Sequence, residues 1–113
     1  MFEFGSIVLT RFPFTDLSGG KVRPALVVSR DNERRVDVVL AFITSRTLNP
    51  PLPDSFAIQP SAVNGLKVPS LIRFDKLATL EKGVVAGQIG RMEASALVAA
   101  KPVFFGVFGF AGG

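Results

Sequence analysis

The chain has 113 residues, of which 48% are hydrophobic, so it is long enough for one folded domain but too short for two. It carries 13 Lys and Arg against 9 Asp and Glu, and this formal net charge of +4 favours a polyanionic partner. It contains neither Cys nor His, which excludes disulfide scaffolds, thiolate nucleophiles, imidazole general bases and ordinary zinc sites. Any catalysis must therefore use carboxylates, hydroxyls, lysine and arginine.

Short apolar segments separated by turn residues run through most of the chain. They are rich in Val, Ile and Phe, residue types that are favoured in strands. We expect strands at Ser6–Phe12, Ala25–Ser29, Val36–Ser45, Ser55–Gln59 and Ser70–Phe74. Closely spaced short strands predict a single, mainly β domain over residues 1–113, folded as a small barrel or curled sheet.

Two loops between these strands are typical of functional or mobile segments. The loop from Phe12 to Lys21 is long for a chain of this size, and the crossing from Asn49 to Asp54 is rich in proline. Gly19-Gly20-Lys21 is followed by Val22 and then by a strand, so the Ser or Thr and the helix of a phosphate-binding P-loop are missing. We interpret the two glycines as a hinge.

The N-terminal segment predicts the location of the protein. The segment Met1–Gly5 has no basic region followed by an apolar core, so no signal peptide is expected and the predicted location is the cytoplasm.

Residues 94–113 carry a single charge, Lys101, and approach the length of about 20 residues that a membrane span needs. The Lys101-Pro102 pair and several glycines argue against a membrane helix. We expect a terminal helix from Glu93 to Lys101, packed on the sheet and followed by an apolar tail.

A cation and a carboxylate are expected side by side on the last predicted strand. Alternation along a strand places Leu71, Arg73 and Asp75 on one face, with the Cα atoms of Arg73 and Asp75 about 6 to 7 Å apart. A phosphate group fits between two such side chains. On the strand that ends at Ser45, the hydroxyl of Thr44 closes an apolar run, and Ser45 is interpreted as a turn cap.

Arg23 is held in extended geometry by Pro24, which follows it. Its side chain is therefore aimed rather than loosely tethered, which suits a clamp on phosphate. A second interpretation is equally open, because an arginine that precedes a proline on an edge strand discourages extension of the sheet.

Five segments together, in the same order, resemble the MazF/PemK family of toxins from bacterial toxin–antitoxin pairs. They are GSIVL at residues 5–9, FPFTD at 12–16, KVRPALVVS at 21–29, AFITS at 41–45 and SLIRFDKLATL at 70–80. The resemblance implies a small SH3-like barrel with a C-terminal helix, a fold shared with CcdB-like proteins. It implies a homodimeric, ribosome-independent endoribonuclease that cuts single-stranded RNA without a metal. It also implies a cognate antitoxin that blocks the RNA groove, and an antitoxin–toxin complex that binds operator DNA.

The resemblance also assigns site residues. The arginine of the family's R-P motif corresponds to Arg23, the threonine of its I-T-[SA] motif to Thr44, and the acid and base of its R-x-D pair to Arg73 and Asp75. The chain departs from the family near its C-terminus, where Lys-Pro and then FFGVFGF replace a polar amphipathic helix. That departure bears on dimer packing and antitoxin docking more than on the chemistry.

The residue types present also constrain a mechanism of RNA cleavage. With no His in the chain and no cofactor expected, the best-placed nucleophile is the 2′-hydroxyl beside the phosphorus, which predicts 2′,3′-cyclic phosphate and 5′-hydroxyl ends. Asp75 is the candidate general base, aided if apolar neighbours raise its pKa. Arg23 and Arg73 are expected to stabilise the developing dianion, unless one of them acts as the acid. Thr44 would donate a hydrogen bond to a phosphoryl oxygen.

Further residues are candidates for contacting the RNA strand. Arg11, Lys21, Arg46 and Lys76 would follow its backbone, and Phe12 or Phe14 would stack a base. Two other functions stay open. A CcdB-like protein inhibits DNA gyrase through protein contact and cleaves nothing, and the fold alone does not separate it from a nuclease. A degenerate copy would only bind RNA or an antitoxin.

Overall fold

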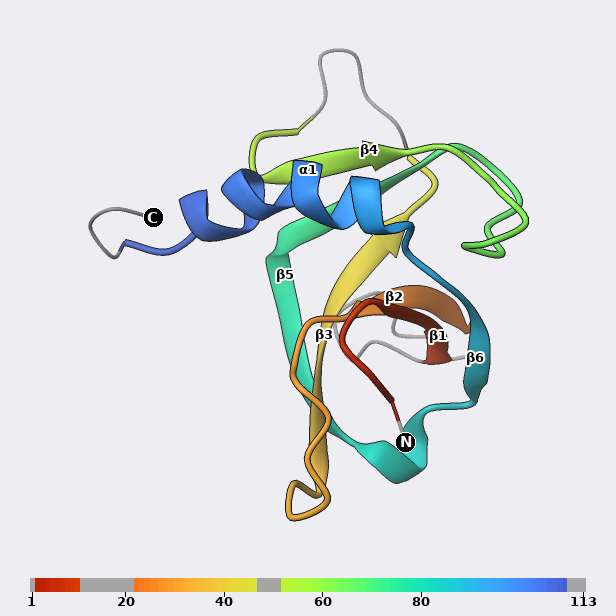
Figure 1. Cartoon of the computed structure of the whole chain (residues 1–113), viewed down its shortest axis with the longest axis vertical. Helices are drawn as coiled ribbons and strands as arrows, with labels where there is room; N and C mark the ends of the chain where they lie inside the picture. Colours follow the sequence, from red (N-terminus) through yellow and green to blue (C-terminus); the bar gives the residue numbers. More distant parts are fainter. Residues whose placement is uncertain (1, 11–21, 47–51, 110–113) are drawn as a thin grey trace.

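The computed structural model describes residues 2–10, 22–46 and 52–109 (Figure 1). These residues form one six-stranded sheet, a 3₁₀ turn η1 (Lys82–Val84) and one helix. The strands are β1 (Ser6–Thr10), β2 (Arg23–Val27), β3 (Asp37–Thr44), β4 (Ser55–Ile58), β5 (Ser70–Glu81) and β6 (Gly87–Arg91), and the helix is α1 (Ala94–Gly106). The prediction of a mainly β fold with a C-terminal helix is confirmed.

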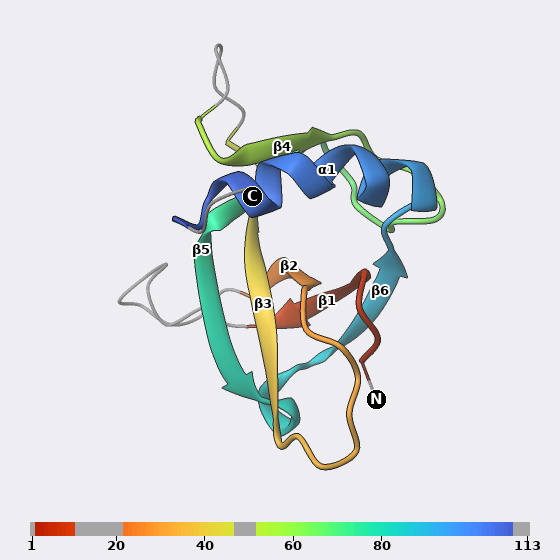
Figure 2. The same cartoon turned by 60° about the vertical axis from the view of Figure 1, so that its left-hand side comes forward.

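The sheet has the strand order β4-β5-β3-β2-β1-β6, and every neighbouring pair is antiparallel. It curls so strongly that β5 and β6 lie on opposite sides of its interior in Figures 1 and 2. Helix α1 crosses one end of the curled sheet beside β4. The architecture therefore matches the expected small barrel or curled sheet.

Alternate residues of the strands build two apolar clusters, one on each face of the sheet. The cluster that packs against α1 includes Ile7, Leu26, Ile43, Ile72, Phe74 and Ala100. The cluster on the other face is formed by Val8, Ala25, Val27, Val38, Leu40 and Phe42. Because successive side chains of a strand point to opposite faces, a nearly continuous apolar run such as VVLAFI in β3 contributes to both clusters. Each large aliphatic side chain buried in this way stabilises the fold by roughly 1.5 to 3 kcal/mol.

Strand β5 is longer than expected and is irregular in the middle. The prediction ended the strand before two charged residues, Asp75 and Lys76, but the structure continues it well past them. The pairing of β5 with β3 shifts register between Arg73 and Leu77. Residues 74–76 therefore bulge out of the ladder, which accommodates the two charged residues without ending the strand.

Strand β6 is not anticipated by the sequence pattern. Its segment GQIGR contains two glycines, which weaken strand propensity. In the structure it pairs with β1 and completes the sheet. A Cβ atom at Gly90 would lie 2.5 Å from backbone atoms of Asn64 and Val63. Gly90 thus weakens the strand pattern in the sequence, but its missing side chain lets the segment at Val63 and Asn64 pack closely against β6.

Helix α1 also continues beyond its predicted end. The prediction ended it at Lys101 because Pro102 follows, whereas the structure extends it by another turn with this proline inside. A proline in a helix removes the hydrogen bond to the carbonyl four residues earlier. That carbonyl belongs to Val98, which is exposed to water. The added turn places the Phe104 ring edge-to-face on Phe74, with 5.5 Å between ring centres.

A membrane-spanning interpretation of the C-terminal segment finds no support in α1. Within the described part of the chain, no helix combines the length and the apolar character that crossing a bilayer requires. The apolar residues of α1 are instead divided between the cluster under the helix and its outer surface, where Val98 and Phe105 are exposed. Phe108, just after the helix, is partly exposed as well.

Candidate functional site

The register of three neighbouring strands brings predicted site residues onto one face of the sheet. Ala25 of β2 pairs with Phe42 of β3, which in turn pairs with Arg73 of β5. Side chains alternate along a strand, so Arg23 and Thr44, each two residues from this row, belong to the same face. The three polar residues are therefore spread over two strand spacings, about 10 Å of one sheet face.

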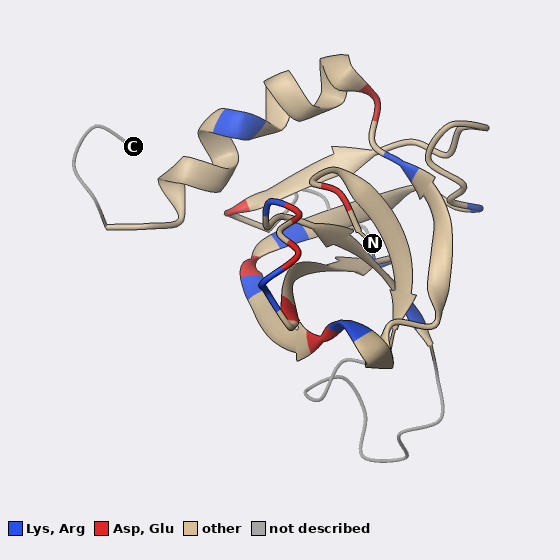
Figure 3. Ribbon diagram, turned by 60° about the horizontal axis from the view of Figure 1, so that its bottom comes forward, with Lys and Arg blue, Asp and Glu red and all other residues tan. Residues whose placement is uncertain are grey.

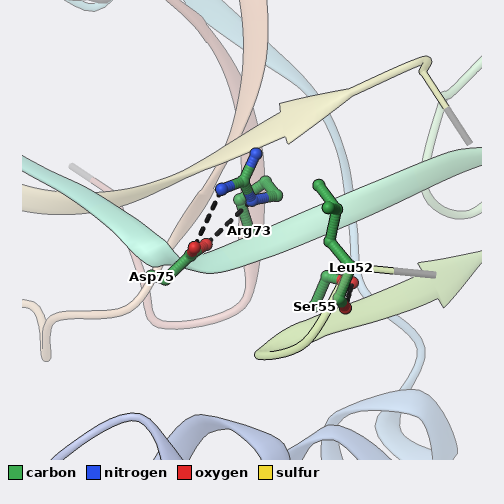
Figure 4. A network of polar contacts seen from close by, with 4 residues as sticks. All are labelled: Leu52, Ser55, Arg73 and Asp75. Carbon is green, nitrogen blue, oxygen red and sulfur yellow. Dashed lines mark hydrogen bonds and ion pairs between the residues drawn. The ribbon is translucent and has the colours of Figure 1, made fainter. Parts of the chain in front are cut away.

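Arg73 and Asp75 form a two-point ion pair (Figure 4). Nε of Arg73 donates to Oδ1 of Asp75 and Nη2 donates to Oδ2, each at 2.8 Å. The side chains are 17% and 33% exposed, respectively, so the pair is accessible to a ligand. Parallel hydrogen bonds of this kind fix the planes of both groups. The expected proximity is confirmed, but the two side chains bond directly instead of flanking a space for phosphate.

The ion pair moves both pKa values away from neutrality. Hydrogen bonds from Arg73 lower the pKa of Asp75 below its ordinary value of 3.8, and they outweigh partial burial, which acts in the opposite direction. Hydrogen bonding to Asp75 raises the pKa of Arg73. The idea that apolar neighbours raise the pKa of Asp75 is therefore wrong for the protein without RNA. At neutral pH this carboxylate is ionised and can accept a proton, but it is a weak base.

Arg23 begins an interior strand rather than an edge strand. Strand β2 lies between β3 and β1, so the interpretation of Arg23 as a guard on a sheet edge is wrong. Pro24 pairs with Leu9 of β1, but the pairing of β2 with β3 begins only at Ala25. The proline, which has no N–H to donate, therefore lies just outside the ladder between β2 and β3. The Arg23 side chain is half-buried, and its buried Nε has no hydrogen-bond partner in the part of the chain that the structure describes. Most buried donors are paired, so this unpaired one marks Arg23 as a candidate functional residue.

Thr44 ends β3 with its hydroxyl oxygen already engaged. Oγ1 accepts a hydrogen bond from the backbone N–H of Arg46 at 3.1 Å. Thr44 therefore caps this turn, a role that the sequence pattern assigned to Ser45. The hydroxyl hydrogen takes no part in that bond, and it can be donated to a phosphoryl oxygen.

The structure places some of the cations that were expected to follow an RNA strand. Lys76 lies in the β5 bulge, with its Nζ 5.9 Å from the centre of the Phe42 ring and hence close to the row that contains Arg73. Arg46 is exposed in the turn after β3. The other RNA-contacting candidates lie outside the described residues, as does the Gly19-Gly20 hinge; they are Arg11, Phe12, Phe14 and Lys21.

Charged residues of both signs are interspersed over the described part of the chain (Figure 3). Lys and Arg positions occur on the sheet, in its turns and on α1, and acidic positions lie among them. Lys82 and Asp31, for example, form an ion pair with 3.9 Å between Nζ and Oδ1. The candidate site therefore depends on the local geometry of its side chains more than on a dense basic patch.

Sequence patterns do not single out two neighbours of Arg73. Phe42 faces it from β3, and Ser55 faces it from β4. The hydroxyl of Ser55 donates to the carbonyl of Leu52, away from the ion pair (Figure 4). In the sequence Phe42 is one apolar residue in a long apolar run, so only the register between strands identifies it as part of the site.

Comparisons with known proteins bear on the family of the chain. The family model for PemK-like, MazF-like toxins of type II toxin–antitoxin systems matches residues 3–101. The chain is similar in structure to the toxin MazF-mt6 of Mycobacterium tuberculosis, with 26% identity and a TM-score of 0.73 over 91% of this chain and 95% of that one. It is also similar to a mycobacterial endoribonuclease in complex with its cognate antitoxin, with 22% identity and a TM-score of 0.75 over 97% of each chain. MazF of Deinococcus radiodurans gives 22% identity and a TM-score of 0.73 over 96% of this chain and 97% of that one. No sequence match to a curated protein was found.

The curled sheet with one helix across its end is the fold of the small β toxins among these structural neighbours. Neighbours below 25% identity establish the shared fold alone, whereas the family match extends over most of the sequence. The chain belongs to the family of PemK-like, MazF-like toxins of type II toxin–antitoxin systems. The family expected from the five sequence segments is thereby confirmed.

Proposed function

We propose that this chain is the toxin of a toxin–antitoxin pair and acts as a metal-independent endoribonuclease that cuts single-stranded RNA at specific sequences. The observation that carries the proposal is the Arg73–Asp75 ion pair, which shares a sheet face with Arg23 and Thr44. Similarity to an endoribonuclease in complex with its cognate antitoxin supports the activity and an antitoxin partner. The proposal includes action in the cytoplasm and binding of operator DNA by the toxin–antitoxin complex.

The proposed reaction begins at the 2′-hydroxyl of the RNA. The carboxylate of Asp75 takes the hydroxyl proton, the 2′-oxygen forms a bond to phosphorus, and the bond from phosphorus to the 5′-oxygen breaks. The products are a 2′,3′-cyclic phosphate and a 5′-hydroxyl, whose proton comes from an arginine of the site or from water. Arg23 and Arg73 stabilise the charge that develops on the nonbridging oxygens, and Thr44 donates a hydrogen bond to one of them.

Binding of the substrate phosphate to Arg73 changes the basicity of Asp75. A phosphate oxygen competes with the Asp75 carboxylate for the N–H groups of Arg73, since both are anionic acceptors. When Arg73 turns to the phosphate, Asp75 loses the hydrogen bonds that lower its pKa and becomes a stronger base. The raised pKa of Arg73 disfavours proton donation by this residue while the pair is intact, which favours its role as a clamp.

Two pH profiles of RNA cleavage test this exchange of partners. In the free protein Asp75 stays ionised until the pH falls through its lowered pKa, so the acid limb of kcat/KM should lie below pH 3.8. In the RNA complex the pKa of Asp75 rises, so the acid limb of kcat should lie at higher pH. For stability the sign is the same: the ion pair contributes above the unfolded-state pKa, and this contribution is lost as the pH falls through the folded-state pKa. Acid limbs that superimpose would contradict the exchange.

Cleavage is expected to survive removal of divalent metal. The chain has neither His nor Cys, and residues 2–10, 22–46 and 52–109 contain no group of three or more acidic side chains placed to hold a metal ion. The test incubates purified protein with a mixed-sequence RNA in EDTA and maps both ends of the products. Cyclic phosphate and 5′-hydroxyl ends support the proposal, whereas strict dependence on Mg²⁺ contradicts it. Absence of cleavage with and without metal would favour a gyrase inhibitor or a degenerate copy.

A homodimer is expected to form through the apolar end of α1. Phe105 and Phe108 are 43% and 37% exposed; exposed apolar patches mark interfaces, and a twofold dimer would cover this one with its own copy. Light scattering should find a dimer at micromolar concentration and weaker association after deletion of residues 103–113. That deletion also removes Phe104 from its contact with Phe74, so Phe105→Ser with Phe108→Ser is the sharper variant. A monomeric wild-type protein would contradict the prediction.

A further inference from the structure

The sequence contains a single Asn-Gly pair, Asn64-Gly65, in the segment between β4 and β5. Asparagine is a thermolabile residue. It reacts most readily before glycine, because glycine has no side chain to hinder attack of its backbone nitrogen on the asparagine amide. The other two asparagines, Asn32 and Asn49, precede a glutamate and a proline. A glutamate side chain hinders the attack and a proline nitrogen has no hydrogen to lose, so Asn64 is the most reactive asparagine of the sequence.

In the folded protein the side-chain amide of Asn64 is held on both sides. Its Oδ1 accepts hydrogen bonds from the backbone N–H groups of Ser61 at 3.0 Å and Leu66 at 2.9 Å. Its Nδ2 donates to the carbonyl of Gln59 at 2.8 Å. The residue is fully buried. The bonds therefore fix the orientation of the amide, and burial keeps water away from it.

The nitrogen that would attack this amide is held as well. The N–H of Gly65 donates to the carbonyl of Ser61 at 3.0 Å. The N–H of Asn64 donates to Oγ of Ser61 at 3.0 Å, and this hydroxyl donates to Glu93 at 2.8 Å. Ring closure requires the Gly65 nitrogen to lose its proton and to turn toward Cγ of Asn64. The folded structure opposes both changes, because these hydrogen bonds would have to break.

The fold requires both residues of the reactive pair. The φ of Gly65 is +72°, and a Cβ atom at this position would lie 2.2 Å from the carbonyl oxygen of Ile89. Only glycine combines this backbone conformation with so close an approach. At position 64 the fold needs an acceptor for two N–H groups and a donor to a carbonyl on one short side chain, which asparagine supplies and aspartate does not. The native contacts thus retain a labile pair and protect it.

We propose that Asn64 is a deamidation site that reacts only when residues 59–66 are open, so that its modification marks a chain that has unfolded and hinders its return to the native fold. The Gly65 nitrogen gives its proton to the solvent and forms a bond to Cγ of Asn64. The side-chain nitrogen takes up a proton from the solvent and leaves as ammonia. Water then opens the resulting succinimide at either carbonyl, which leaves aspartate or isoaspartate at position 64.

Either product opposes refolding. Aspartate places a carboxylate oxygen where Nδ2 now donates to the carbonyl of Gln59, 2.8 Å away. A buried carboxylate that faces a carbonyl oxygen is costly, because it loses its water and gains no donor there. Isoaspartate adds a methylene group to the backbone next to Gly65, where the close approach to Ile89 leaves no room.

Incubation of the wild-type protein with and without urea tests the protection. Both samples are kept at mildly alkaline pH, and peptide mapping by mass spectrometry follows the fraction deamidated at Asn64. We expect the reaction to be about 100-fold slower in the folded protein, because it requires an open state in which several hydrogen bonds are broken. Equal rates in the two samples would overturn the proposal.

Two variants assign the protection to the contacts of Asn64. Glu33→Gly places a glycine after Asn32, which is exposed but whose Oδ1 accepts the same type of bond, from the N–H of Arg34 at 2.9 Å. In this folded variant Asn32 should deamidate within about tenfold of its rate in urea, while Asn64 stays protected. Ser61→Ala should speed the reaction at Asn64 roughly tenfold without urea, since it removes two hydrogen bonds of the network. Equal protection of Asn32 and Asn64 would overturn the proposal.

Removal of urea after the incubation tests the effect on folding. Chains modified at Asn64 should be depleted from the refolded fraction, or should unfold at lower urea concentration than unmodified chains in the same sample. Asn64→Asp provides one of the two products in pure form and should show the same loss. Modified chains that regain the wild-type unfolding midpoint would overturn the second part of the proposal.

Discussion

Arg73→Ala is expected to slow RNA cleavage by about 100-fold or more while the protein remains folded. In the proposed reaction the guanidinium stabilises the charge that develops on the phosphate, and removal of one such donor typically costs roughly 10²- to 10³-fold in rate. The Arg73 side chain is 17% exposed and belongs to neither apolar cluster, so truncation removes the ion pair with Asp75 but no contact within those clusters. Single-turnover cleavage rates measured beside thermal melts test this expectation.

Arg23→Ala should slow cleavage to a similar extent, because its guanidinium is the second clamp on the same phosphate. Arg34→Ala is the matched control: Arg34 lies exposed in the turn between β2 and β3, and its loss removes the same charge. This control should keep the wild-type rate. If Arg23→Ala or Arg73→Ala loses stability in step with activity, the residue has a structural role instead. The comparison matters for both arginines, because both residues are partly buried.

Asn64→Ala is expected to lower the free energy of unfolding by about 3 kcal/mol or more. The substitution leaves the N–H groups of Ser61 and Leu66 and the carbonyl of Gln59 without the partner that they share. A buried group deprived of its hydrogen bond costs roughly 1 to 3 kcal/mol. Equilibrium unfolding in urea measures the change.

A second asparagine provides the control for this experiment. The side-chain oxygen of Asn32 accepts one hydrogen bond, from the backbone N–H of Arg34 in an exposed turn. Water can replace that bond, so Asn32→Ala should change the free energy of unfolding by no more than about 0.5 kcal/mol. Similar losses for Asn32→Ala and Asn64→Ala would contradict the view that Asn64 organises residues 59–66 through its buried hydrogen bonds.

The features that could be predicted from the sequence are those that depend on neighbouring residues. Apolar runs bounded by turn residues located β1 to β4 and the beginning of β5. The alternation of side chains along a strand placed Arg73 beside Asp75. The fixed backbone of Pro24 indicated an aimed side chain at Arg23, although the choice between an interior and an edge strand required the strand order.

The features that could not be predicted depend on contacts between distant segments. Gly90 weakens the strand pattern of β6, and its necessity becomes evident only when Asn64 and Val63 are packed against it. The register shift at residues 74–76 follows from how β5 meets β3. Asn64 has the appearance of an ordinary turn residue in the sequence, yet it is fully buried.

The pairing of β1 with β6 has a consequence for the timing of synthesis. Ile7 pairs with Gly90, so the first strand made on the ribosome is completed by the last. The β1 edge that receives β6 stays unpaired until nearly the whole chain has emerged, and closure over so long a separation is slow compared with the formation of local contacts. The sheet should therefore close only after β6 has emerged from the ribosome, with a delay set by the docking of β6 on β1.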